Sequence, residues 1–139
     1  MEKGKIRYFT ISNRIGELTV LASITEDLAQ QWHLPDALAM NINLVMEEAL
    51  SNIIYYAYND SAEHKIRISI SLGKQGLTIR IRDDGIPFDP SSHLLPDISL
   101  SAMDRPVGGL GIFLISKFMD TVHYSRKNYL NILTLTKKI

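Results

Sequence analysis

Three short segments of the chain contain residue types that together suit the binding of a nucleotide. Glu48 to Asn52 places a carboxylate four residues before a carboxamide, Asp83 to Gly85 puts two acidic residues before a glycine, and Gly108 to Gly111 is rich in glycine. In this order they offer oxygen ligands to a hard cation, an acceptor to the amino group of a base, and backbone amides to phosphates. The sequence therefore predicts a pocket for ATP with Mg²⁺.

The carboxylate and the carboxamide of the first segment lie on one predicted helix. Apolar residues recur at three- and four-residue intervals from about Ala37 to Tyr58. At 100° per residue, one edge of that apolar stripe carries a line of polar residues: Asn41, Glu48, Asn52 and Asn59. Asn52 offers a carbonyl oxygen to magnesium, and Glu48 can accept a proton from an attacking hydroxyl group. The ordinary alternative is a solvated flank of the helix.

Asp83 closes a predicted strand whose inward residues are Ile79 and Ile81. A carboxylate in that position can accept a hydrogen bond from the exocyclic amine of adenine, and Gly85 would let the backbone approach the ring. An Asp-Gly turn that merely ends the strand explains the same residues.

Glycines Gly108, Gly109 and Gly111, with Leu110 between the last two, precede a predicted amphipathic helix. Such a loop brings amides close to phosphate oxygens at the positive end of the helix dipole, although a flexible hinge has the same composition. Arg105 lies just before the loop and could reach a terminal phosphate, or it could be a solvated arginine.

The elements that must position these residues follow from hydrophobic periodicity. Alternating residues predict strands, three- and four-residue spacing predicts helices, and Gly73 to Gly76 predicts a hairpin turn. We expect a helix from near Arg14 to Trp32 that Ser12 and Asn13 cap, and a second helix that Asp36 caps. The remaining expected elements are strands at Lys5–Ile11, His64–Leu72 and Leu77–Arg82, a helix at Leu110–Met119, and a closing hairpin of Val122–Ser125 with Leu130–Thr136.

Composition is that of an ordinary globular protein and predicts a single domain over residues 1–139. The hydrophobic fraction is 45%, the charged fraction is 22% and the formal net charge is zero, so the bulk charge predicts no nucleic-acid or membrane partner. No run approaches the roughly 20 apolar residues that span a bilayer. Cysteine is absent, which fits a reducing cytoplasm and excludes thiol chemistry and disulfides.

The ordered motifs resemble those of the anti-sigma-factor serine kinases of the GHKL (Bergerat-fold) ATPase superfamily. Glu48–Asn52 is similar to the N-box of that family, Asp83–Pro90 to its adenine-binding box and Gly108–Ile115 to its second glycine box. Lys117–Asp120 matches the continuation of the family pattern. The likeness covers almost the whole chain and is specific because the motifs occur jointly.

This resemblance implies a fold, a set of residue roles and partners. The fold would be an α+β two-layer sandwich of a mixed, mostly antiparallel sheet with helices on one face and an ATP lid at about residues 90–107. Glu48 would be the catalytic base, Asn52 the magnesium ligand and Asp83 the adenine contact. Members bind a sigma factor and phosphorylate a serine of a STAS-domain antagonist, and the resemblance also implies a homodimer.

Two positions depart from the family pattern. Pro87 replaces the second glycine of the adenine box, which removes a flexible point and an amide donor at the mouth of the pocket. Tyr56 stands where a His-Ala-Tyr-like segment usually has its histidine. Neither change removes a group to which we assign chemistry, but both bear on lid motion and on partner fit.

Three functions stay open from the sequence. The leading one is a cytoplasmic, Mg-ATP-dependent protein-serine kinase and anti-sigma regulator, because nothing in the sequence offers a deep site for a small acceptor molecule. The second is a nucleotide-dependent switch that binds a protein without phosphoryl transfer. The third is the catalytic domain of a histidine kinase acting in trans, against which the absence of a phosphoacceptor helix pair counts.

Overall fold

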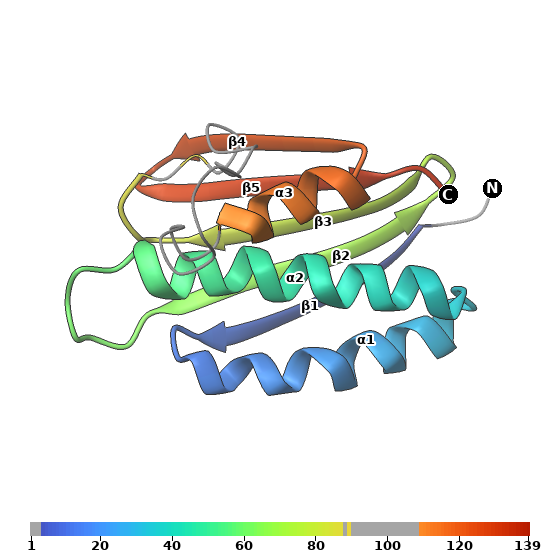
Figure 1. The fold of residues 1–139 in the computed structure, drawn as a ribbon, viewed down its shortest axis with the longest axis horizontal. Helices are drawn as coiled ribbons and strands as arrows, with labels where there is room; N and C mark the ends of the chain where they lie inside the picture. Colours follow the sequence, from blue (N-terminus) through green and yellow to red (C-terminus); the bar gives the residue numbers. More distant parts are fainter. Residues whose placement is uncertain (1–3, 88, 90–108) are drawn as a thin grey trace.

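The computed structural model describes residues 4–87, 89 and 109–139. It contains a single antiparallel sheet that packs against helices. The elements in chain order are β1 (Lys5–Ser12), the 3₁₀ helix η1 (Ile15–Leu18), α1 (Thr19–Trp32), α2 (Asp36–Tyr56), β2 (Lys65–Gly73), β3 (Gly76–Asp83), α3 (Gly109–Phe118), β4 (Thr121–Lys127) and β5 (Leu130–Lys137) (Figure 1). The strand order is β1-β2-β3-β5-β4.

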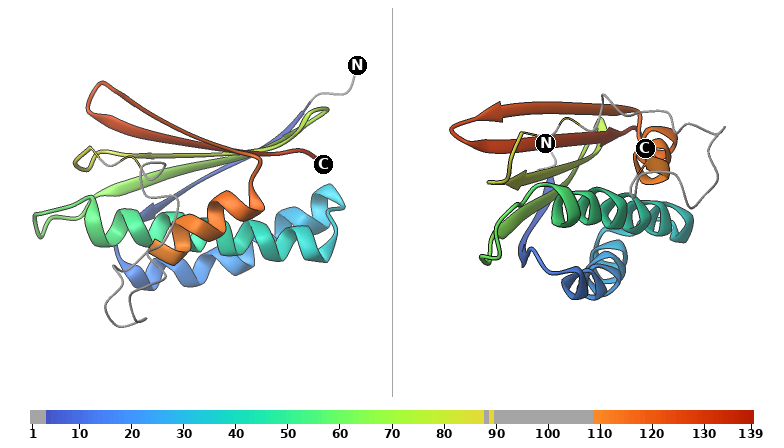
Figure 2. Two further views of the ribbon diagram at one scale, coloured as in Figure 1. Left: turned by 45° about the horizontal axis from the view of Figure 1, so that its top comes forward. Right: turned by 60° about the vertical axis from the view of Figure 1, so that its left-hand side comes forward.

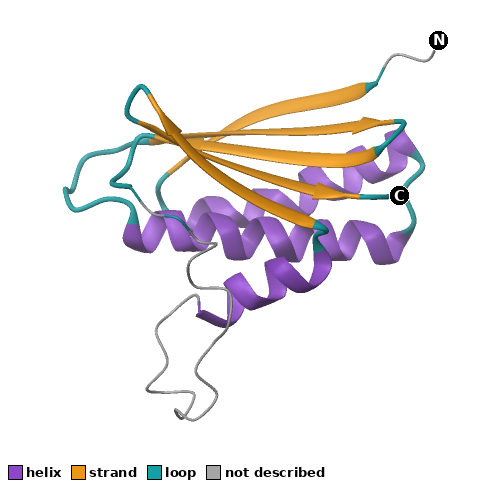
Figure 3. Cartoon of the chain, turned by 90° about the horizontal axis from the view of Figure 1, so that it is seen from above, coloured by secondary structure: helices purple, strands orange, loops and turns teal. Residues whose placement is uncertain are grey.

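The two-layer α+β prediction is confirmed, with one correction to the sheet. Helices α1, α2 and α3 cover the same face of the sheet, and the other face is uncovered by any described element (Figures 2 and 3). Each neighbouring pair of described strands is antiparallel, so the expectation of a mixed sheet is wrong. One hairpin joins β2 to β3 and another joins β4 to β5, which makes each pair antiparallel. Strands β3 and β5 are neighbours in the sheet although α3 and β4 lie between them in the chain.

Isoleucines and leucines at alternate positions of the central strands form the floor of the core. The residues are fully buried against the apolar stripe of α2: Ile66, Ile68 and Ile70 on β2, and Leu77, Ile79 and Ile81 on β3. Each such side chain contributes about 1.5–3 kcal/mol on leaving water. Trp32 at the end of α1 is also in this core.

The start of α1 differs from the predicted start. A 3₁₀ turn precedes the helix, and neither Ser12 nor Asn13 caps it. The Ser12 hydroxyl instead donates to Glu17 Oε1 at 2.6 Å, and Asn13 Oδ1 accepts from the backbone N–H of His64 at 3.0 Å. Asn13 thus bonds His64, which is distant in the sequence, instead of capping α1. The sequence around Asn13 carries no signal of this contact.

Helix α2 is also slightly shorter than predicted. Pro35 occupies the position before the helix, and Asp36 is its first residue rather than its cap. The acidic side chain still lies in the first turn, where the helix dipole favours it. Asn59 lies beyond the last helical residue, Tyr56, so it does not continue the polar line on the helix.

The hairpin predicted at Gly73 to Gly76 is confirmed. Gly76 has a φ of 127°, which is unfavourable for any residue with a β-carbon. None of the described helices is long and apolar enough to cross a membrane.

Candidate functional site

Asn52 and Asp83 line the same pocket, although 30 residues separate them in the sequence. The pocket lies where α2, α3 and strands β3, β4 and β5 meet. Its lining consists of Ala49, Asn52, Ile53, Ala57, Asp83, Ile115, Tyr124, Asn131 and Leu133. Two polar side chains that the sequence analysis selected are thus set among apolar ones, which is the general composition of a ligand site.

Asp83 is a buried carboxylate that is held in one orientation. Its Oδ1 atom accepts hydrogen bonds from the backbone N–H of Gly85 and from Nδ2 of Asn131, each at 2.9 Å. Burial raises the pKa of the carboxyl group, and these two hydrogen bonds oppose that rise. Oδ2 has no hydrogen-bond partner among the described residues, so it is the acceptor that remains for a ligand.

Asn131 is a site residue that the sequence analysis missed. It lies directly opposite Asp83 in the β3–β5 ladder, and besides Asp83 its Nδ2 atom bonds the Ile86 carbonyl at 2.8 Å. Its Oδ1 atom accepts from the Tyr124 hydroxyl at 2.5 Å and from the Arg126 guanidinium at 3.0 Å. The sequence did carry a signal for it: Asn131 alternates with the buried residues Leu133 and Leu135 along a strand, so it faces inward. A buried asparagine must find hydrogen-bond partners.

The N-box residues are one turn apart on α2, as predicted, but only one of them lines the pocket. Asn52 is buried, and its Nδ2 atom has no hydrogen-bond partner among the described residues. Glu48 is half-buried and lies outside the pocket lining. Burial, and secondarily the charge of Glu47, raises the pKa of the Glu48 carboxyl group. An unpartnered buried amide is a group whose bonds a ligand can complete.

The oxygen donors fit a magnesium ion that is held mainly by phosphates and water. No cluster of three or more histidine or acidic side chains suited to a metal ion occurs in the described part of the chain. Asn52 offers a carbonyl oxygen to the ion, and Glu48 places a carboxylate one turn earlier on α2. Mg²⁺ commonly takes only one or two protein ligands when it binds with a nucleotide.

Gly85 has a packing role that the sequence analysis did not foresee. A β-carbon at this position would lie 2.5 Å from both Cβ and the carbonyl oxygen of Ala57. The next residue, Ile86, donates its N–H to the same Ala57 carbonyl at 2.7 Å. The glycine therefore lets the loop after β3 lie against the end of α2, and this contact places Asp83 next to the helix that carries Asn52.

The glycine box lies partly within the described chain. Gly109 is the first residue of α3, so Gly109, Leu110 and Gly111 form its first turn, one residue earlier than predicted. Farther along the same helix, Ile115 lines the pocket. Gly108, Arg105 and the predicted lid at residues 90–107 lie outside the described residues.

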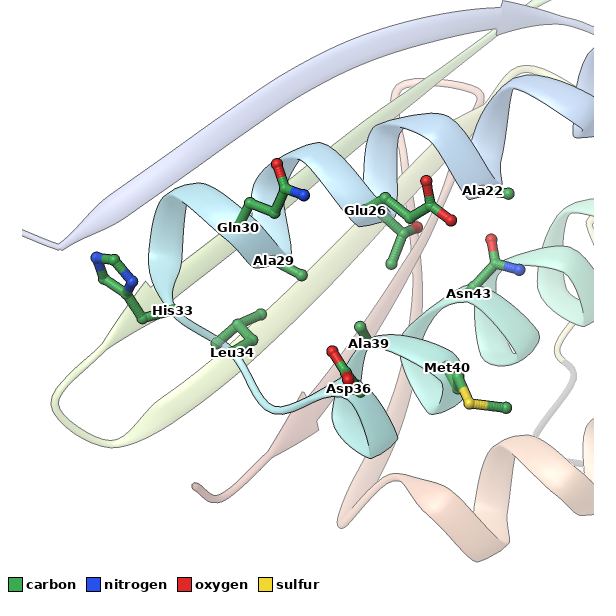
Figure 4. A pocket seen from close by; sticks show the side chains of 11 residues that line it. Ala22, Glu26, Ala29, Gln30, His33, Leu34, Asp36, Ala39, Met40 and Asn43 are labelled. Atoms are coloured by element: carbon green, nitrogen blue, oxygen red, sulfur yellow. The ribbon is translucent and has the colours of Figure 1, made fainter.

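The pocket is small, and a larger hollow lies elsewhere. Its volume is about 20 Å³, which is less than a purine base occupies. A groove of about 630 Å³ runs between α1 and α2 and includes Ala29, Met40 and Asn43 (Figure 4). None of the predicted site residues lines that groove, so its size alone does not make it the candidate site.

Comparison with known proteins gives a family for the chain. The family model described as histidine kinase-like ATPase domain matches residues 11–137. The chain is 30% identical over 129 residues to the serine/threonine-protein kinase BtrW of Bordetella bronchiseptica, and the match covers 86% of this chain and 89% of that protein.

Two further relatives match over shorter stretches. The anti-sigma F factor of Oceanobacillus iheyensis is 30% identical over 81 residues, which are 58% of this chain and 56% of that protein. The serine-protein kinase RsbW of Listeria monocytogenes is 27% identical over 86 residues, covering 59% and 55%. The chain thus spans a little over half the length of these two relatives.

Solved structures support the fold. The histidine kinase domain of a blue-light activated kinase from Erythrobacter litoralis EL346 has a TM-score of 0.52 at 17% identity, over 89% of this chain and 60% of that one. The histidine kinase AdeS of Acinetobacter baumannii has a TM-score of 0.51 at 16% identity, over 96% and 68%. With the family model and the relatives above, the chain belongs to the histidine kinase-like ATPase domain family and is homologous to its anti-sigma factors and serine kinases.

Proposed function

We propose that this protein is an ATP-dependent protein-serine kinase that acts as an anti-sigma regulator. The observation that carries the proposal is the meeting of Asn52 and Asp83 in one pocket, with Glu48 one helical turn away. The relatives named above as a serine/threonine-protein kinase, a serine-protein kinase and an anti-sigma factor support the same class of activity.

Recognition of the base depends on the orientation of Asp83. Because Asn131 and the Gly85 amide occupy Oδ1, the Oδ2 atom is left to accept a hydrogen bond from an exocyclic amine. A purine with a carbonyl oxygen in that position would face a carboxylate oxygen instead, and two acceptors repel. We infer that the site favours adenine over guanine.

Chemistry requires a base and a cation near the phosphates. Magnesium ATP, when bound, supplies the transferable phosphoryl group and neutralises its charge. Asn52 would hold the metal through its carbonyl oxygen, and Glu48 would accept the proton of the attacking serine hydroxyl. The raised pKa of Glu48 suits this role, because a base works best when its pKa approaches the working pH.

The remaining residues and partners are part of the same proposal. Arg105 and the glycine box at Gly108, Gly109, Leu110 and Gly111 would contact the phosphates, and residues 90–107 would form the lid. The serine would belong to a STAS-domain anti-sigma-factor antagonist, and a sigma factor would be the regulated partner. We further propose a homodimer in the cytoplasm.

Incubation with γ-labelled ATP and candidate STAS-domain proteins tests the proposal. A kinase of this class is expected to label the partner with acid-stable phosphate on serine. Acid-labile label would favour a histidine kinase instead, and ATP-dependent partner binding without label would favour a switch. Either of these two results would overturn the kinase proposal.

A further inference from the structure

His64, at the entry to β2, lies between two carboxylates. Its Nε2 atom is 2.9 Å from Oδ1 of Asp60, and its Nδ1 atom is 3.1 Å from Oδ1 of Asp84. The Tyr58 ring stacks on the imidazole with centroids 4.3 Å apart and an angle of 19° between the planes. The histidine therefore joins the loop after α2 to the loop after β3, and both lie at the same end of the molecule (Figure 1).

This arrangement selects the protonated form of His64. Carboxylates only accept hydrogen bonds, and a neutral imidazole has a single N–H group. His64 can donate hydrogen bonds to Asp60 and Asp84 at the same time only when each of its ring nitrogens carries a proton. The tyrosine face below the ring also favours a cation.

The carboxylate that His64 holds belongs to the loop that carries the proposed adenine acceptor. Asp84 follows Asp83 directly and precedes Gly85, so its position affects the orientation of both. Other anchors of this loop in the described chain include Asn131, Arg126 and the Ala57 carbonyl, which form hydrogen bonds with Asp83, Gly85 and Ile86. Among these anchoring groups in the described chain, His64 alone titrates near neutral pH.

We propose that His64 is a positioning residue, which in its protonated form ties Asp84 to Asp60 and thereby fixes the loop that presents Asp83 to the nucleotide. The inference rests on the proposed ATP site and adds a regulatory property to it. ATP affinity is greatest when His64 is charged and falls as it loses its proton.

The surroundings of His64 set the direction in which its pKa shifts. The groups that face or flank the ring are Tyr58 just after α2, Asp60 and Glu63 in the next loop, Asp84 after β3, and Lys65, which pairs with Glu63 at 3.5 Å. The hydrogen bond with Asp60 is the largest cause that raises the pKa of His64, and Asp84 adds to it. Burial raises the pKa of Tyr58, so its phenol stays neutral across this range.

The sign of the pH effect follows from that shift. A raised histidine pKa means that the bridge is complete below the ordinary value of about 6.5 and is lost as pH rises through the higher, folded-state value. The exposed carboxylates limit its size, because ion pairs at the surface are screened by water. We expect ATP affinity to weaken by about two- to five-fold between about pH 6 and about pH 8.5.

Calorimetric titration with Mg-ATP at these two pH values tests the inference in three proteins: the wild type, His64→Gln, and the control His123→Gln, whose side chain is exposed on β4. The ratio of the wild-type and variant dissociation constants at each pH cancels the titration of the nucleotide itself. His64→Gln is expected to weaken binding at the lower pH and to match the wild type at the higher pH. His123→Gln is expected to follow the wild type throughout. An equal loss for His64→Gln at both pH values would overturn the proposal, because it indicates a role independent of charge.

A second variant keeps the test independent of folding defects. Asp60→Asn preserves the Asp84 contact but removes the main cause of the raised His64 pKa. In titrations at a series of pH values, the midpoint of the affinity change should therefore move downward. An unmoved midpoint would also contradict the inference. If neither the wild type nor any variant binds ATP at all, the proposed function fails instead. If ATP binds but the ratio of the wild-type and His64→Gln dissociation constants is the same at both pH values, the ATP site stands and the His64 role is refuted.

Discussion

At the scale of single residues, the site depends on acceptors whose orientation is fixed by neighbouring donors. Asp83 Oδ1 accepts hydrogen bonds from the Gly85 amide and from Asn131, whereas no described residue bonds its Oδ2 atom. Glu48 has no comparable side-chain hydrogen bond with another described residue, and burial raises the pKa of its carboxyl group. The two carboxylates therefore have different surroundings, which suits the different roles proposed for them, as in many acid–base pairs in enzymes.

Replacing Glu48 separates binding from chemistry. Glu48→Ala is expected to retain ATP binding and to lose phosphoryl transfer by about 100-fold or more, because general base catalysis is removed. Transfer to a STAS-domain partner, together with calorimetry on the same variant, measures both effects. Glu26→Ala on α1 is a control, since that glutamate lines the α1–α2 groove and is not among the residues that line the candidate pocket. A Glu48→Ala protein that phosphorylates its partner at the wild-type rate would remove Glu48 from the mechanism.

Replacing Asp83 should weaken the nucleotide but spare the fold. In Asp83→Asn the amide oxygen still accepts from Gly85 and Asn131, and the buried charge with its raised pKa is gone. The unliganded protein is therefore expected to melt at the same or a higher temperature. Loss of the charged acceptor should cost about 2 kcal/mol of ATP binding, roughly thirtyfold, in calorimetry. Unchanged affinity would show that Asp83 does not contact the base.

At the scale of elements, the site depends on how the loop after β3 meets the end of α2. The close approach of Gly85 to Ala57 and the hydrogen bond from Ile86 to the same residue hold the two elements together. This contact sets the relative position of Asp83 and Asn52, which belong to different layers of the sandwich.

A methyl group at Gly85 should disturb that junction. Gly85→Ala is expected to destabilise the protein by about 1–3 kcal/mol, because the new atom meets the Ala57 backbone, which has no rotamer to change. Thermal unfolding without nucleotide measures this cost. Gly73→Ala is the matched control, since a β-carbon added at that position would have no atom within 4 Å. If Gly85→Ala kept its melting temperature and lost only ATP binding, the glycine would serve the ligand rather than the junction.

Elements with long periodic patterns were predictable from the sequence, and junctions between elements were not. The alternation of Ile66 to Ile70 and the apolar stripe of α2 specify their own secondary structure, because burial of one face requires it. The start of α1 was mispredicted since Asn13 bonds the backbone of His64 rather than its own helix. Asn131 was missed because its partner Asp83 is a neighbour only in the folded sheet.

At the scale of the whole molecule, the candidate pocket lies at the seam between the helical layer and one half of the sheet. Strands β3 and β5 meet in the sheet only because the chain leaves it through α3 and returns by β4. Residues from distant parts of the sequence thus reach one place. The ordered motifs predicted this meeting for Asn52 and Asp83, while Glu48 lies next to the pocket rather than in its lining.

Ligand binding at such a seam should stabilise the whole fold. Mg-ATP at 100 times its dissociation constant is expected to add about 2.7 kcal/mol to the free energy of unfolding, because ligand binds only the folded chain. Thermal unfolding should show a higher melting temperature with ATP and Mg²⁺ together than with ATP and a chelator. Equal melting temperatures in the two solutions would contradict the role proposed for the metal.

The side-chain amides provide the most direct test of where the nucleotide binds. Asn52 and Asn131 lie in the candidate pocket, whereas Asn43 lies in the larger α1–α2 groove (Figure 4). In a nuclear magnetic resonance titration with Mg-ATP, the side-chain NH₂ signals of Asn52 and Asn131 are expected to shift and saturate together, while that of Asn43 stays in place. A shift of the Asn43 signal with the other two unmoved would place the nucleotide in the groove and contradict the account.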